Sequence, residues 1–392
     1  MKDNISQSDY YKVIAVVMLS PITALGAQYC IQPVIKLISV SFGRGPEGAG
    51  LIMSACLLGM ALALLALVGI SERLPVKKCV IGALGFGCLT TAGAMLVKSF
   101  TLFLVLRALQ GAILAVIPVL AVAYARRILP KEKVGFAVSM YVCGGSIGGL
   151  SGRLMMGVLA DWVGWEKAML YLGSLYFLFT LLILYLMKPD KELAPLESQQ
   201  MGQQPDFFSR ENLPLLWVCL FGFSFGGCFL SVFNFIPYVF SAPPYSFSTS
   251  VIGMLFTLQV VGTFSSFAAG KLHSCFGPGK IMLANLLLIL AGIWISVLVP
   301  VLAKILGLVL IIGGFFAVHA MASGVCGQVA RVNKAGATAA YMFFYYSGAS
   351  IMTAACGYLY AAWGWWGIVG LITALVAVSC AILSCLWKYM EE

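Results

Sequence analysis

Apolar runs long enough to cross a lipid bilayer follow one another along almost the whole chain. The bilayer core is about 30 Å thick, and an α-helix crosses it with about 20 residues. Lipid offers no partner for open backbone N–H and C=O groups, so these runs must be helical. Twelve transmembrane helices are predicted, near residues 13–35, 49–70, 79–97, 101–124, 135–160, 167–187, 213–239, 250–270, 281–300, 303–325, 337–362 and 366–387.

The composition agrees with a chain that is surrounded by lipid. Of its 392 residues, 61% are hydrophobic and 10% are charged, whereas a soluble domain is about half apolar and about a quarter charged. The twelve runs fill the length, so no sizeable soluble domain is expected. The 12 Cys are scattered, and most lie inside apolar runs. We therefore expect no metal site, no disulfide framework and no cofactor.

Positive charge predicts the orientation. The net charge is +10, but the basic residues lie in short loops, which is typical of a topology signal and not of a nucleic-acid partner. An even number of spans puts both termini on one side, and most Lys and Arg fall on that side. Because cytoplasmic loops carry the excess of Lys and Arg, we expect both termini in the cytoplasm of a protein of the cytoplasmic (inner) membrane. No cleaved N-terminal signal is evident.

One long polar segment divides the chain. Residues 188–212, KPDKELAPLESQQMGQQPDFFSREN, are rich in Gln, Pro and charge, as in a cytoplasmic linker. They separate a predicted N-terminal six-helix bundle (1–187) from a C-terminal one (213–392). The expected fold is an all-α integral membrane protein with twelve transmembrane helices in two pseudo-symmetric six-helix bundles.

The two groups of spans also share a sequence pattern. A shift of 200 residues aligns GVLADWVGW (157–165) with GYLYAAWGW (357–365). Identical pairs nearby are Ala137/Ala337, Tyr141/Tyr341, Gly148/Gly348, Gly157/Gly357, Leu159/Leu359, Gly164/Gly364 and Trp165/Trp365. Secondary transporters use such internal repeats for alternating access around a site near the bilayer midplane.

With this pattern the chain resembles the major facilitator superfamily over essentially its whole length. The loop VGISERLPVKK (68–78) is similar to the family's signature after span two, although Val68 and Pro75 replace two of its glycines. RALQGA (107–112) looks like its membrane-embedded Arg motif. SGRLMMGVLADWVGW (151–165), GGFFAVHA (313–320) and YMFFYYSG (341–348) resemble the acriflavine-sensitivity subfamily of efflux permeases. The resemblance implies the major facilitator fold and leaves the substrate open.

Six charged residues are candidates for gating. For the signature loop, the family resemblance implies a cytoplasmic gate that forms in one state and opens in the other; a topology signal is the alternative. Arg153 and Asp161 lie at helical spacing near the outer end of span five. The favoured interpretation for them is a helix-end anchor and gate contact. The six are Glu72, Arg73, Lys77, Lys78, Arg153 and Asp161.

Arg107 is the sharpest candidate for contact with substrate or coupling ion, together with Gln110 of the same motif. A guanidinium within an apolar span costs several kcal/mol unless it faces protein or water. Arg107 would bind an anionic group or respond to a nearby proton. A structural Arg that donates to helix carbonyls is the alternative.

Every Asp and Glu falls in a terminus, a loop or a span end, so no carboxylate is expected at mid-bilayer. This absence weakens proton antiport and charge-paired recognition of cationic drugs. His319 in span ten is the mid-span group whose ordinary pKa suits proton exchange near neutrality. A His held by a neighbouring carbonyl is equally compatible with the sequence.

Polar and aromatic residues of several spans complete the predicted pocket. Gln32 and Asn234 offer neutral hydrogen bonds, either to substrate or between helices. Such pockets are mostly apolar with few polar groups, although an aromatic stripe is more often packing. The aromatic candidates are Tyr29, Phe233, Tyr341 and Tyr345.

The sequence therefore predicts a secondary active transporter and not an enzyme. The favoured activity is efflux of a small hydrophobic organic solute or drug by alternating access, with protons as the candidate coupling ion of an antiporter. We expect a monomer whose partners are the solute and the bilayer. Two alternatives stay open: an organic-anion, sugar or carboxylate transporter with Arg107 as counter-charge, and a channel or non-transporting receptor on the same fold.

Overall fold

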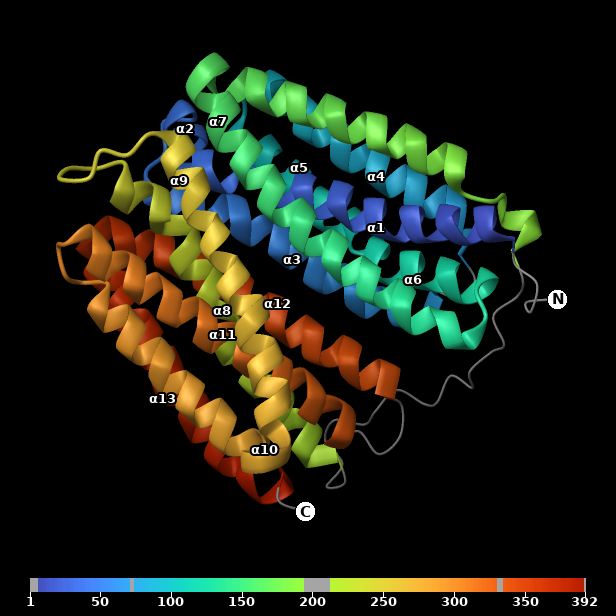
Figure 1. Cartoon of the computed structure of the whole chain (residues 1–392). Helices are drawn as coiled ribbons and strands as arrows, with labels where there is room; N and C mark the ends of the chain where they lie inside the picture. Colours follow the sequence, from blue (N-terminus) through green and yellow to red (C-terminus); the bar gives the residue numbers. More distant parts are fainter. Residues whose placement is uncertain (1–5, 71–73, 194–211, 330–333, 391–392) are drawn as a thin grey trace.

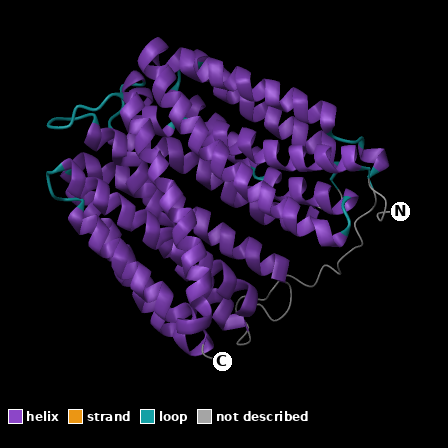
Figure 2. Cartoon of the chain, in the orientation of Figure 1, coloured by secondary structure: helices purple, strands orange, loops and turns teal. Residues whose placement is uncertain are grey.

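The computed structural model describes residues 6–70, 74–193, 212–329 and 334–390, and within these ranges every regular element is a helix. Figure 2 shows the helices joined by short loops. The linker predicted at 188–212 falls largely outside the described residues, as do Glu72 and Arg73.

The first half of the chain forms the helices that pack around α1. In chain order they are α1 (Gln7–Tyr29), η1 (Gln32–Val34), α2 (Ile35–Ser41), α3 (Pro46–Ile70), α4 (Val76–Ala92), η3 (Gly93–Leu96), α5 (Phe100–Leu114), α6 (Val116–Ile128), α7 (Lys131–Leu186) and η4 (Asp190–Glu192). The first span begins at Gln7 and not near residue 13, because the Ser6 hydroxyl accepts from the Asp9 N–H at 3.1 Å and caps the helix before the apolar run starts.

The second half forms a second group of helices. Its elements are α8 (Leu213–Phe240), α9 (Thr249–Leu255), η6 (Phe256–Gln259), α10 (Val260–Ile295), α11 (Val301–Val329), α12 (Lys334–Trp363) and α13 (Trp365–Met390). The apolar runs predicted for this half lie on these helices.

Two of the long helices fold back on themselves at a glycine. Gly164 in α7 has φ 81°, and Gly277 in α10 has φ 74°. Both angles lie in the left-handed region that side chains with a Cβ avoid. A straight helix of 56 residues, the length of α7, would be about 84 Å long, far more than the bilayer core. The chain therefore crosses twice within each of these segments, as Figure 1 shows for α7 and α10.

Counted this way, the described residues give twelve crossings. Nine segments are long and apolar enough to span a membrane. Two of them are the α7 hairpin and the segment of α9, η6 and α10, which each supply two crossings, and α12 supplies the remaining one. The all-α membrane fold predicted from the sequence is confirmed.

The two halves pack against each other at one end, and α3 of the first half also packs along α12 of the second. Figure 1 shows them in contact where α2 and α9 lie, and diverging toward the end where both chain termini lie. We call the contact end the distal side, because it is opposite to the termini. There Lys36 Nζ donates to Ser241 Oγ at 2.6 Å, and the Tyr238 hydroxyl donates to the Gly45 carbonyl at 3.3 Å. A cavity between the halves is thus closed on the distal side.

Candidate functional site

A central cavity of about 460 Å³ lies between the two halves. Its wall takes residues from α1, α3, α5, α6 and α7 on one side and from α8, η6, α11 and α12 on the other. Gln28, Tyr29, Arg153, Gln259 and His319 are its principal polar residues. No Asp or Glu among the described residues lies on this wall.

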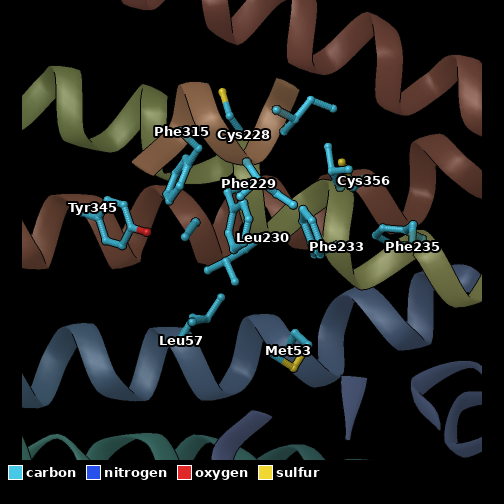
Figure 3. Close-up of a cluster of buried hydrophobic side chains, with 14 of the residues drawn as sticks. Met53, Leu57, Cys228, Phe229, Leu230, Phe233, Phe235, Phe315, Tyr345 and Cys356 are labelled. Atoms are coloured by element: carbon cyan, nitrogen blue, oxygen red, sulfur yellow. The ribbon is translucent and has the colours of Figure 1, made fainter. Parts of the chain in front are cut away.

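Aromatic rings form the wall contributed by the second half. Phe229 stacks on Phe315 with ring centroids 4.6 Å apart, and Phe316 meets Phe229 edge-on at 5.5 Å. Figure 3 shows Phe229, Phe315 and Tyr345 facing α3, with Met53 and Leu57 opposite. The cavity therefore has a surface of stacked aromatic rings on which the apolar part of a ligand can pack.

His319 stands at the edge of these rings on α11. Its ring is parallel to that of Phe315, within 4° at 6.0 Å, and lies 4.9 Å from the ring of Tyr345. The hydroxyl of Tyr341 lies 3.4 Å from His319 Nδ1. His319 and Tyr345 lie on the cavity wall, whereas Tyr341 and Phe233 are buried behind it.

Arg153 of α7 reaches the distal end of the cavity from the first half. Its side chain is 4% exposed. Nε donates to Gln32 Oε1 at 2.5 Å, and one Nη donates to the Gly149 carbonyl at 2.7 Å. The guanidinium lies over the rings of Tyr29 at 4.8 Å and Phe256 at 5.2 Å, which favours a cation.

A polar relay runs from this arginine across the interface between the halves. Gln32 Nε2 donates to Asn234 Oδ1 at 2.6 Å, while Gln32 Oε1 accepts from Arg153. Asn234 Nδ2 is buried and has no acceptor among the described residues. Gln32 lies just after the end of α1, so the break in that helix presents the amide to the second half.

Arg107 lies inside the first half and not on the cavity wall. It is 5% exposed and donates to the Gln28 carbonyl at 3.0 Å and to Gln110 Oε1. Gln110 Nε2 in turn donates to the Gly87 carbonyl and to Thr91 Oγ1, both at 3.1 Å. The two residues of the Arg motif thus join α1, α4 and α5.

Backbone contact at pairs of glycines closes the distal side. A Cβ on Gly157 would lie 2.6 Å from the Thr249 carbonyl oxygen and 3.2 Å from Gly253 Cα. A Cβ on Gly50 would lie 3.2 Å from Gly357 Cα. Gly157 and Gly357 are equivalent positions of the internal repeat, so the same device closes the interface twice. We call these two contacts the distal seal.

Asp161 strengthens one of the two contacts. Its carboxylate accepts from the backbone N–H of Thr249 at 3.0 Å, and from the N–H and hydroxyl of Ser250 at 2.8 and 2.5 Å. An aspartate at the start of a helix satisfies N–H groups that have no partner within the helix. These bonds join α7 of one half to α9 of the other.

The described residues of the signature loop make contacts within their own half. Lys77 Nζ donates to the Met187 carbonyl at 2.5 Å. The Asp190 carboxylate accepts from the backbone N–H groups of Lys77 and Lys78, at 2.8 and 3.4 Å. In this conformation the loop thus fixes the start of α4 to the segment after α7.

The model of the Major Facilitator Superfamily matches residues 17–353 of the chain. The chain belongs to the major facilitator superfamily. It is 31% identical over 356 residues to the uncharacterized MFS-type transporter YybF of Bacillus subtilis, over 90% of this chain and 87% of that protein. It is 27% identical over 354 residues to the inner membrane transport protein YnfM of Escherichia coli, over 90% of this chain and 84% of that protein.

Solved structures show the same fold. A crystal structure of a bacterial homologue of the human lysosomal transporter Spinster, in an inward-facing and occupied conformation, matches 98% of each chain with a TM-score of 0.78 and 15% identity. This major facilitator protein is a membrane transporter and not an enzyme.

Several residues at the interface of this transporter carried no clear signal in the sequence. Ser54 and Ser350 place their hydroxyl oxygens 2.8 Å apart across the halves, and Gln259 lies on the cavity wall. A serine or glutamine in an apolar span is common helix–helix glue. The repeat pairs Gly157 with Gly357 in the sequence, but the contacts of these glycines with the opposite half come from the structure.

Proposed function

We propose that this transporter exports a small, largely hydrophobic organic solute across the inner membrane by alternating access. The observation that carries the proposal is the aromatic cavity between the halves, closed distally by the glycine seal and by Asp161. If both termini are cytoplasmic, as the charge pattern predicts, this is the state that loads solute from the cytoplasm. We expect the protein to act as a monomer, and the motif resemblance favours the acriflavine-sensitivity subfamily.

Proton coupling would run through His319. It is the wall residue whose side chain exchanges a proton near neutral pH in its ordinary state, and the wall has no carboxylate among the described residues. Solute and proton would then bind to the same cavity wall, which is what coupling between them needs. Arg107 and Gln110 would hold α1, α4 and α5 in place around it, because their bonds stay within that half.

Reconstitution into liposomes tests the proposed activity. Vesicles are loaded with unlabelled solute, and labelled solute is added outside, for a panel of dyes, sugars and organic acids with and without an imposed pH gradient. A carrier gives transient accumulation of label by exchange, whereas a channel gives none. Exchange of an aromatic solute supports the proposal; the absence of exchange for every member of the panel contradicts it.

Replacing His319 by glutamine should separate exchange from proton coupling. Gradient-driven transport should fall on the order of tenfold, because the wall loses its proton acceptor, while exchange at equal pH continues. His273 is the other of the two histidines, and it is not on the cavity wall. His273→Gln is therefore the matched control and should behave as wild type. Gradient-driven transport that is unchanged in His319→Gln would exclude this residue as the coupling group.

A further inference from the structure

Arg153 is a buried charge without an anionic partner. The ion pair present among the described residues joins Lys188 and Asp9, far from the cavity. A guanidinium in an apolar span is costly unless it faces protein groups or water that stabilise it. The neutral oxygens of Gln32 and Gly149 and two aromatic faces stabilise Arg153 in part. Its positive charge is left for something that enters the cavity.

Hydrogen-bond donors at this end of the cavity are also left free. Arg153 uses Nε and one Nη, so a guanidinium with five N–H groups keeps several without an acceptor among the described residues. Gln259 Nε2, on the opposite half, is buried and likewise lacks an acceptor there. A ligand that presents two or more acceptor oxygens would satisfy donors from both halves at once.

The part of the wall contributed by α8 and α11 favours an apolar body. Phe229, Phe315 and Phe316 present stacked and edge-on rings beside these donors. The volume of about 460 Å³ is within the ordinary range for a small-molecule pocket. The combination is one cationic, donor-rich end joined to an apolar, aromatic chamber.

We propose that the substrate is a small organic monoanion, a carboxylate or sulfonate on an aromatic or otherwise apolar body. Its oxygens bind Arg153 and Gln259, and its body packs on the phenylalanine wall. This inference rests on the proposed transport function and adds to it the class of solute. It places the counter-charge on Arg153, because Arg107 does not lie on the cavity wall and both of its Nη groups donate to acceptors within the first half.

Binding to the purified protein in detergent tests the inference without relying on transport. The probes are naphthalene-1-sulfonate and its uncharged analogue naphthalene-1-sulfonamide, titrated by the rise in thermal unfolding temperature. Wild type should bind the sulfonate at least about tenfold more tightly than the sulfonamide, because charge-assisted hydrogen bonds are stronger than neutral ones. Equal affinity for the two probes overturns the inference.

Variants then locate the counter-charge. Arg153→Gln should weaken sulfonate binding roughly 10- to 100-fold and weaken sulfonamide binding much less, because the sulfonamide loses a hydrogen bond and no charge pair. Gln259→Leu removes a neutral donor and should weaken sulfonate binding less. It tests the same site independently if the Arg153→Gln protein does not fold. Lys304→Gln is the matched control: Lys304 is a buried cation bonded to the Ser296 carbonyl, outside the cavity. Full sulfonate preference in both Arg153→Gln and Gln259→Leu refutes the assignment.

Exchange of labelled sulfonate in liposomes separates this inference from the proposed function. Selective binding with exchange supports both. Selective binding without exchange, in vesicles that contain folded protein, rejects the transport proposal and retains the anion site. Exchange of neutral dyes without any preference for the sulfonate supports transport and rejects the anion site.

Discussion

Replacing Gly157 by valine should hold the transporter with its distal side open and slow solute exchange at least about tenfold. The new side chain would overlap the Thr249 carbonyl and approach Gly253 Cα across the interface. Overpacking of this kind costs about 1–3 kcal/mol. It raises the free energy only of the state in which the two halves are in contact at Gly157. A shift of about 1.4 kcal/mol between two states changes their ratio tenfold.

The measurement combines exchange with access from the distal side. A cysteine in place of Ser54, a buried residue of α3 at the interface between the halves, should react faster with a membrane-impermeant thiol reagent when Gly157 is valine. The background for both proteins lacks the native cysteines. Gly82→Val is the control, because a Cβ there meets nothing within 4 Å. Rapid exchange and slow labelling in the Gly157 variant would contradict the role of the distal seal.

Replacing Gly348 by valine should instead prevent stable folding. A Cβ on Gly348 would lie 1.9 Å from the Phe223 carbonyl oxygen, inside the second half where α12 packs on α8. Both conformations of an alternating-access cycle keep this contact, so the substitution lowers the free energy of unfolding of both. We expect a loss of about 3 kcal/mol or more.

Thermal unfolding and size-exclusion chromatography in detergent measure this loss. Gly370→Val on α13 is the control, since a Cβ there meets nothing within 4 Å. We expect the control to behave as wild type and Gly348→Val to give little monodisperse protein. A Gly348→Val protein with an unchanged unfolding temperature would show that α8 and α12 can separate without cost.

The repeat seen in the sequence therefore contains two kinds of glycine. Gly148 and Gly348 permit close packing within each half, on Ile22 and Phe223 respectively. Gly157 and Gly357 permit contact between the halves. Both pairs could be read from the alignment, because a close backbone approach needs glycine wherever it occurs. Which helices they approach depended on the packing of distant segments, which the pattern does not contain.

The arginines show the same limit more sharply. Arg107 and Arg153 each stand out in an apolar span, and the sequence favoured Arg107 for substrate because its motif resembles the family's. In the structure the break after α1 places Gln28 against Arg107 and Gln32 against Arg153. The first arginine is thereby held within one half and the second lies on the cavity wall. Helical periodicity gives a face of one span and not the partner that covers it.

The spans themselves were predictable because a backbone surrounded by lipid must form its hydrogen bonds internally, which an apolar run of this length does as a helix. Length and hydropathy predict the crossings, which the structure confirms; the domain boundary placed at the polar segment after residue 187 stays a prediction. The short elements around the cavity, η1 and η6, were not predicted. A break of a few residues does not change the hydropathy of a run, yet it directs Gln32 and Gln259 toward the interface.

A reversible lock across the halves tests the central claim most directly. Ser54 of α3 and Ser350 of α12 have hydroxyl oxygens 2.8 Å apart, so cysteines at both positions, in a background without the native cysteines, are within reach of a disulfide. Oxidation should stop solute exchange in liposomes, and a reductant should restore it, while either single cysteine has no such effect. Exchange at the full rate by the cross-linked protein would show that the halves do not separate there during transport.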